Sequence, residues 1–299
     1  MVYVLTQTDP LPVEPYLTVD EYRQAPTGVD TSGLVKGDQA ASLAELGNVI
    51  ARASSWADLL CNQVLAATPD MEGRRVGVSK DGILKIHPRF TPVVAVTAVS
   101  YGSTPNSLAA LTDLSNVWIE PAQICVPLDG SAGVNSTFAG PLGFSAVRPG
   151  VSLFVQWKYI AGYPNTTLTA TTTAGASSIS VKTAGGIVGG ATQLTIYDGT
   201  RTETVIVDPS YVTGSTTVPL TGPLVFAHGQ VGVSVSALPP AAKQAVILLT
   251  SALIKTRGSS AMVMQSIRGE ASRQARGEAG MMEEVEIADE LLSPYRRVW

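Results

Sequence analysis

The stretch "VSLFVQWKYIAG" (residues 151–162) places its large apolar side chains at every second position. In an extended strand these alternate residues share one face, and they are Val151, Leu153, Val155, Trp157 and Tyr159. Upstream, "GILKIHP", "PVVAVTAVSYG", "NVWIE" and "QICVPL" also fit strands, because Pro and Gly separate short apolar runs. We therefore predict an antiparallel sheet between about Gly73 and Gly162, packed against helices.

The apolar period changes to that of a helix on both sides of the predicted sheet. "YLTVDEYRQAP" (residues 16–26) contains Thr18 as a candidate N-cap and Glu21 three positions later, a capping box that predicts a short helix. A longer core helix is predicted from one apolar stripe, which consists of Leu43, Leu46, Ile50, Ala53, Ala57, Leu60 and Val64. Downstream, "LPPAAKQAVILLTSALIKTRG" (residues 238–258) has Pro239 and Pro240 where a helix begins. We expect these two long helices to pair.

Residues 166–235 have a different composition, with sixteen threonines and only five charged side chains. "QLTIYDGTRTETVIV" (residues 193–207) predicts a hairpin that turns at Asp198 and Gly199. "SSISV", "TTVPL" and "QVGVSVS" add further short strands, which predicts a small all-β sandwich or barrel inserted into the host. Of its aromatic residues, we expect Tyr197 and Phe226 in the core and Tyr211 on the surface.

These patterns predict the α+β class and three segments. Residues 1–163 form the first part of a host domain, residues 164–237 the inserted Thr-rich module, and residues 238–299 the second part of the host. The last segment comprises a helix, an exposed arm, and a final helix from about Glu283 to Leu292. In the final helix we expect a buried stripe of Met282, Val285, Ala288 and Leu292, and a solvated or partner-facing side of Glu283, Glu284, Glu286 and Glu290.

Composition and motifs give no sign of catalysis. The 24 acidic residues outnumber the 20 basic ones, which disfavours a protein that grips nucleic acid, although DNA could pass along it. We predict no signal peptide and no membrane span. Cys61 and Cys125 are expected to be buried apolar side chains. His87 and His228 have no His, Cys or paired carboxylate near them in the sequence, so we predict structural histidines, no metal ion, no cofactor and no enzyme activity.

The C-terminus ends in Tyr295, Arg296, Arg297, Val298 and Trp299. Aromatic residues and arginine are the types that anchor protein–protein interfaces. A tail of this composition either folds back onto its own chain or inserts into a partner.

Several stretches together resemble the head-to-tail adaptor (connector) proteins of long-tailed bacteriophages. They are "YLTVDEYR", "ADLLCNQVL", "ILKIHPRFTPVVAVTAVSYG", "LPPAAKQAVILLTSALIKTRG" and "ELLSPYRRV". The region from "WKYIAGYPNT" to "FAHGQVG" is similar to a β module that the larger adaptors of phages of actinobacteria carry. The resemblance covers nearly the whole chain and rests on packing and turn patterns rather than on catalytic motifs.

This resemblance implies a structural virion protein at the head-to-tail interface, or neck, made in the host cytoplasm. Copies of the chain would form a ring, typically twelve-fold, beneath the portal protein. The ring would extend the DNA channel without sequence-specific DNA binding, give stopper or tail completion proteins a platform, and have no membrane partner. The resemblance also implies that the C-terminal segment, Tyr295, Arg296, Arg297, Val298 and Trp299, docks onto the portal. The alternatives are a carbohydrate- or cell-surface-binding protein built around the β module, and a hydrolase with an unrecognised site.

Overall fold

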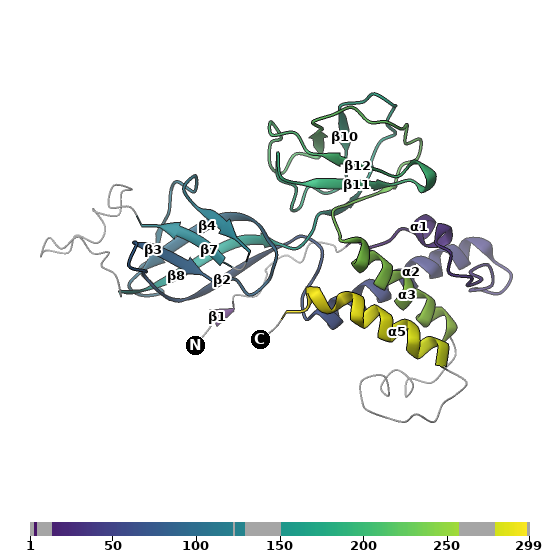
Figure 1. Ribbon diagram of the computed structural model, residues 1–299, viewed down its shortest axis with the longest axis horizontal. Helices are drawn as coiled ribbons and strands as arrows, with labels where there is room; N and C mark the ends of the chain where they lie inside the picture. The colour runs from purple at the N-terminus through teal and green to yellow at the C-terminus, as the bar shows by residue number, and fades with distance from the viewer. Residues whose placement is uncertain (1–2, 5–13, 122, 129–150, 257–278, 298–299) are drawn as a thin grey trace, which may run out of the picture. The chain divides into compact units, whose positions relative to one another are not determined.

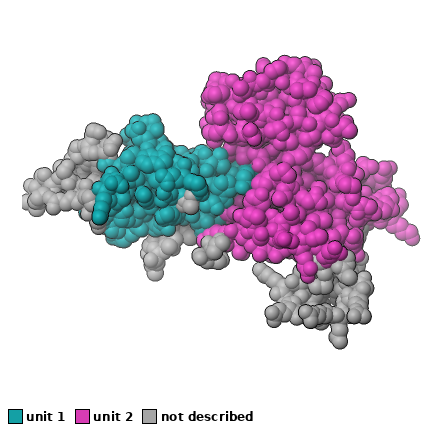
Figure 2. Space-filling model, viewed as in Figure 1, with its two compact units in different colours: residues 1–12, 67–163 teal, residues 13–66, 164–299 magenta. Residues whose placement is uncertain are grey.

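A computed structural model describes residues 3–4, 14–121, 123–128, 151–256 and 279–297. The chain divides into two compact units, shown in different colours in Figure 2. Unit 1 consists of residues 1–12 and 67–163, and unit 2 of residues 13–66 and 164–299. The chain contains helices together with antiparallel sheets, which confirms the α+β class. The division into a host and an inserted module stays a prediction.

The described part of unit 1 is built from strands (Figure 1). They form two antiparallel sheets, one with the order β1-β2-β8-β4-β5 and the other with the order β3-β7-β6. The bounds are β1 Tyr3–Val4, β2 Thr68–Gly77, β3 Ile83–Ile86, β4 Val93–Gly102, β5 Ala109–Ala110, β6 Trp118–Glu120, β7 Gln123–Pro127 and β8 Ser152–Ala161.

Strand β8 is the centre of the larger sheet of unit 1, because it pairs with β2 along its whole length on one side and with β4 from Phe154 to Ala161 on the other. Its predicted apolar face is buried from Leu153 to Tyr159, whereas Val151 precedes the strand and is 36% exposed. The sequence predicts that helices pack against this face. Within unit 1 the cover is instead the second sheet, because Leu84 of β3 and Ile124 of β7 belong to the same buried cluster as Trp157. Packing of sheet on sheet corrects that expectation.

The helices lie in unit 2, and their bounds are α1 Val19–Gln24, α2 Gln39–Cys61, α3 Pro240–Lys255 and α5 Ala279–Leu292. Helix α2 contacts α3, which confirms the predicted pairing, and α5 packs on both. The capping box at Thr18 is confirmed as well. Most of the predicted α2 stripe is buried, but Val64 lies beyond the end of the helix and is 38% exposed. The predicted arm falls mainly on residues 257–278, outside the described residues.

The Thr-rich module also belongs to unit 2 and has its own apolar core. Its sheets have the orders β12-β11-β14-β9 and β10-β13. The bounds are β9 Asn165–Thr167, β10 Ser178–Ser180, β11 Gln193–Tyr197, β12 Glu203–Ile206, β13 Thr217–Pro219 and β14 Ser234–Ser236. The predicted hairpin is β11–β12, and its connection contains the short 3-10 helix η2, Gly199–Arg201, rather than a two-residue turn.

Two expectations about the aromatic residues of the module are wrong. Tyr211 is buried in the module core, and its hydroxyl donates a hydrogen bond to the Ser215 carbonyl oxygen at 2.8 Å. Phe226 is 38% exposed, and its backbone amide donates a hydrogen bond to the Glu203 carboxylate at 3.0 Å. Tyr211 therefore does not offer an exposed ring.

Replacing Trp157 tests the core of unit 1. Trp157→Ala removes a fully buried ring and should lower the free energy of unfolding by about 3–5 kcal/mol. The matched control is Trp118→Ala, because Trp118 is 40% exposed and its loss should cost about 1 kcal/mol or less. Urea unfolding followed by near-UV circular dichroism measures both, and equal losses would contradict the sheet-on-sheet core.

Candidate functional site

The C-terminal segment singled out by the sequence begins by folding back onto helix α2. After α5 comes the 3-10 helix η3, Ser293–Tyr295. The Gln63 side-chain amide donates a hydrogen bond to the Tyr295 carbonyl oxygen at 2.8 Å, and the Arg297 amide donates one to the Cys61 carbonyl oxygen at 3.0 Å. Tyr295 to Arg297 thus lie beside the C-terminal end of α2. Val298 and Trp299 lie outside the described residues.

The last helix presents two different faces. Val285, Ala288 and Leu292 are buried as predicted, and the Met282 side chain lies outside the described residues. Glu283, Glu286 and Glu290 are exposed, as predicted for the outer face.

Glu284 does not belong to this outer face. It is partly buried, and its carboxylate binds the Lys255 ammonium group of α3 at 2.6 Å. Near the end of α5, Arg296 forms an ion pair with Asp289. The first of these ion pairs joins α5 to α3, and the second fixes the start of the tail on α5.

A buried tyrosine–aspartate pair organises the end of α2, next to the tail. The Tyr16 hydroxyl donates a hydrogen bond to the Asp58 carboxylate, and the Leu65 amide donates another at 3.0 Å. Burial raises the pKa of Asp58 to about 6, although both hydrogen bonds act in the opposite direction. Helix α2 ends at Cys61 and is capped by Asn62, which has a left-handed backbone conformation with φ of 53°. The Tyr16–Asp58 pair therefore holds the residues that follow α2 close to Tyr16.

The pKa of Asp58 gives a testable dependence of stability on pH. The folded protein holds this proton more tightly than the unfolded chain does, whose carboxyl titrates near pH 3.8. Stabilisation from this group is thus fully present below about pH 4 and is lost as the pH rises to about 6. The stability of wild type relative to Asp58→Asn should fall over this range, by up to about 3 kcal/mol. Urea unfolding followed by the helical circular dichroism signal measures the difference. The control is Asp20→Asn, at an exposed carboxylate. If the difference in unfolding free energy between wild type and Asp58→Asn stays constant with pH, the prediction is contradicted.

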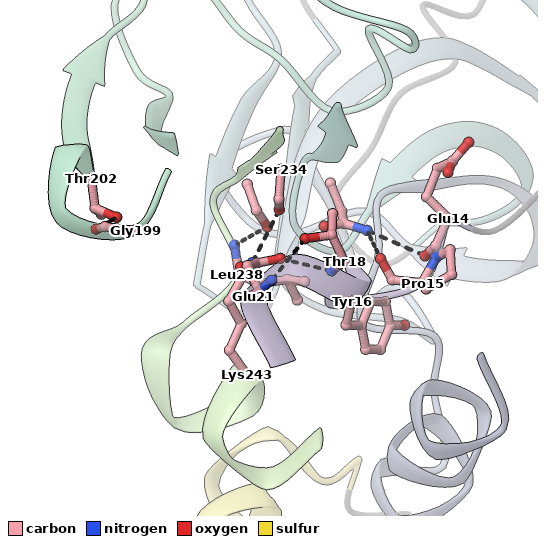
Figure 3. A network of polar contacts seen from close by, with 12 residues as sticks. Glu14, Pro15, Tyr16, Thr18, Glu21, Gly199, Thr202, Ser234, Leu238 and Lys243 are labelled. Carbon is pink, nitrogen blue, oxygen red and sulfur yellow. Dashed lines mark hydrogen bonds and ion pairs between the residues drawn. The ribbon is translucent and has the colours of Figure 1, made fainter. Parts of the chain in front are cut away.

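The most buried cation described in unit 2 is Lys243 of α3, with 4% of its surface exposed. Its ammonium group lies 2.6 Å from the Glu21 carboxylate of α1 and 3.1 Å from the Ser234 hydroxyl of β14 (Figure 3). It also lies 3.6 Å from the centre of the Tyr197 ring of β11. Burial lowers the pKa of Lys243, and the Glu21 carboxylate opposes this effect. One ammonium group therefore connects α1, α3 and two strands of the β module.

Glu21 has two roles at this junction. One carboxylate oxygen accepts the Thr18 amide at 2.8 Å in the capping box, and the other accepts from Lys243. Nearby, the Asn165 side-chain amide donates to the carbonyl oxygens of Glu14 and Pro15, at 3.2 and 3.1 Å. The β module is therefore fixed to helices α1 and α3 through Lys243 and to the segment before α1 through Asn165.

Removing the ammonium group tests this junction. Lys243→Met should lower the free energy of unfolding by about 3–5 kcal/mol, because Glu21 then stays buried without its counter-charge. Adding Glu21→Gln, which keeps the cap, should restore a large part of the loss. As a control, Lys255→Met breaks a half-exposed ion pair and should cost about 1 kcal/mol or less. Thermal unfolding compares the variants, and a double variant no more stable than Lys243→Met would contradict the pairing.

His228 is fully buried in the module between two carboxylates that its neighbours in sequence do not reveal. Its Nδ1 lies 3.0 Å from Asp198 Oδ2, and its Nε2 lies 3.0 Å from Glu203 Oε1. Glu203 also accepts the amides of Val225 and Phe226, at 2.8 and 3.0 Å. The expectation of a structural histidine agrees with these hydrogen bonds, and its two carboxylate partners lie 30 and 25 residues away in the sequence.

A similar buried carboxylate lies in unit 1. Glu72 is 5% exposed, accepts a hydrogen bond from the Tyr159 hydroxyl, and accepts the Arg89 amide at 2.7 Å. Burial raises the pKa of Glu72. The side chain joins the loop after β3 to β8, which is a structural role. His87 in the same loop is exposed.

Cys61 and Cys125 are free thiols and fully buried, as expected. Within the described residues, His, Cys, Asp and Glu side chains do not gather in threes as a metal ion would require. The carboxylates beside His228 bind opposite nitrogens of the ring, so these three groups do not converge on one point. In the same parts of the chain, no helix has the length and apolar character needed to cross a membrane.

Comparisons with known proteins give little further information. The chain matches no protein-family model and no curated protein. Among solved structures it is similar to a chain in one described as "Neck of empty GTA particle computed with C6 symmetry", with 13% identity over 100% of this chain and 96% of that chain. The TM-score is 0.35, and we base no inference on a likeness of this size.

Proposed function

We propose that this chain is a structural head-to-tail adaptor, which forms a ring beneath a phage portal and extends its DNA channel. The proposal rests on where the stretches that resemble head-to-tail adaptors lie in the fold. The stretch "YLTVDEYR" forms α1, "ADLLCNQVL" ends α2, "LPPAAKQAVILLTSALIKTRG" contains α3, and "ELLSPYRRV" ends α5. These stretches are far apart in the sequence, yet their helices pack together in unit 2.

The physical requirements of such a ring agree with this chain. Identical copies close into a ring through side-to-side contacts between two different surfaces of each subunit. Many weak anchors around one ring act together by avidity, so each tail needs only modest affinity. The chain has a net charge of −4, so its overall charge repels DNA phosphates and a ring of such chains would not hold DNA in the channel. A role without catalysis and a place in the neck of the virion belong to the same proposal.

The C-terminal tail is the proposed portal anchor. The contacts of Tyr295 and Arg297 with Gln63 and Cys61 fix the start of the tail at the end of α2. A segment whose beginning is already ordered loses less conformational entropy when the rest docks. Portal docking would then use the side chains of Tyr295 to Arg297 together with Val298 and Trp299.

Shortening the tail tests this assignment. Removing residues 298–299, or all of residues 295–299, should leave the circular dichroism spectrum of the folded protein unchanged and abolish co-sedimentation with portal rings. Arg52→Ala is a matched control, because it removes an exposed arginine of α2 that pairs only with Glu45 among the ion pairs of the described residues. If both shortened proteins still join portal-bearing heads at the wild-type level, the tail is not the anchor.

Mass measurement of the purified protein separates this proposal from the alternatives. An adaptor is either a ring or a monomer that assembles into a ring on portal protein. A protein that stays monomeric and ignores portal rings would contradict the proposal.

A further inference from the structure

An open cavity of about 870 Å³ lies where the end of α1 meets the β module. Its walls come from three separate segments of unit 2, the end of α1, the connection between β11 and β12, and the loop before β14. The lining residues are Gln24, Asp198, Gly199, Thr200, Arg201, Gly229 and Gln230. A volume of this size lies within the range of ligand-binding pockets. The described wall has no aromatic or aliphatic side chain, but the carbon atoms of its polar side chains and glycines make its surface mixed rather than wholly polar.

The carboxylate in this wall is held in place from behind. Asp198 binds buried His228, which in turn binds Glu203. Glu203 is fixed by two backbone amides of the loop that precedes His228. This relay limits the rotation of Asp198, so the carboxylate is ordered before any ligand arrives, which reduces the entropy lost on binding.

Two further polar side chains of the wall have defined positions. The Arg201 guanidinium donates a hydrogen bond to the Ala227 carbonyl oxygen at 3.2 Å. The Gln24 carboxamide lies against Gly199, where an added Cβ atom would be only 2.7 Å from the Gln24 side-chain oxygen. Gly199 also has φ of 57°, a conformation that favours glycine. Glycine at this position therefore allows α1 to bring its amide to the cavity.

The charges and polar groups of the wall restrict the ligand. One carboxylate and one guanidinium cancel, so the cavity favours neither phosphate nor a metal ion. None of the described lining residues has an aromatic or aliphatic side chain to pack against the body of a lipid or an aromatic ligand. Two carboxamides, a threonine hydroxyl and exposed glycine backbone offer both donors and acceptors, in addition to the charged pair. A neutral molecule with many hydroxyl groups satisfies such a mixed set.

We propose that this cavity binds a neutral saccharide. The hydroxyls of the sugar would donate to Asp198 and to the carboxamide oxygens, and would accept from Arg201 and the carboxamide nitrogens. The described lining includes no residue of the tail, so the proposed saccharide site goes beyond the adaptor function and is tested separately from it.

The test uses the full chain and a panel of neutral trisaccharides, maltotriose, mannotriose and arabinotriose, with glucose 6-phosphate as the anionic probe. Saturation-transfer NMR detects contact, and calorimetry measures affinity at sugar concentrations up to roughly 10 mM. Gln230→Ala and Arg201→Ala change exposed residues of the wall. Gln193→Ala is the matched control, because Gln193 is an exposed glutamine of the same module outside the cavity.

We expect at least one neutral trisaccharide to bind with a dissociation constant of about 1 mM or lower. Gln230→Ala and Arg201→Ala should each weaken it about tenfold, and Gln193→Ala should leave it unchanged. The proposal is overturned if no neutral sugar binds, if only glucose 6-phosphate binds, or if both cavity variants bind as wild type does. Portal co-sedimentation of Gln230→Ala should equal that of wild type, which keeps this result separate from the adaptor assignment.

Discussion

The buried ammonium group of Lys243 is the constraint on which unit 2 depends. A charge taken out of water must find partners, and here they come from three separate segments of the chain, Glu21 of α1, Ser234 of β14 and Tyr197 of β11. The same Glu21 carboxylate also completes the cap of α1. The start of that helix is therefore linked to the contact between Lys243 and the β module. The module is thus positioned by the helices rather than joined by the chain alone.

A second organising point is the end of α2. Tyr16 and Asp58 hold the turn that follows the helix, and backbone groups of Tyr295 and Arg297 bind there as well. The proposed portal anchor therefore starts from a rigid place. In a ring, a fixed first residue places every copy of the tail in the same position. Equivalent positions let the weak binding affinities of the separate tails combine.

The β module combines an ordinary apolar core with a polar relay at its edge. Its core takes Tyr211, and the described wall of the cavity contains no aromatic ring on which a sugar could stack. Its polar edge places Asp198, held through His228, in the wall of the cavity. A saccharide site there would depend on hydrogen bonds rather than stacking, and it would leave the helices available for assembly.

The sequence by itself determined the parts of the fold that depend on neighbouring residues. The apolar face of β8, the capping box at Thr18, the α2 stripe and the β11–β12 hairpin follow from local period and local caps. Only the tertiary structure decided the rest. "TPDMEGRRVG" becomes β2 because β8 supplies its backbone hydrogen bonds, although its own pattern does not predict a strand. The partners of Lys243 and His228 lie up to 222 and 30 residues away in the sequence, so no local pattern could place them together.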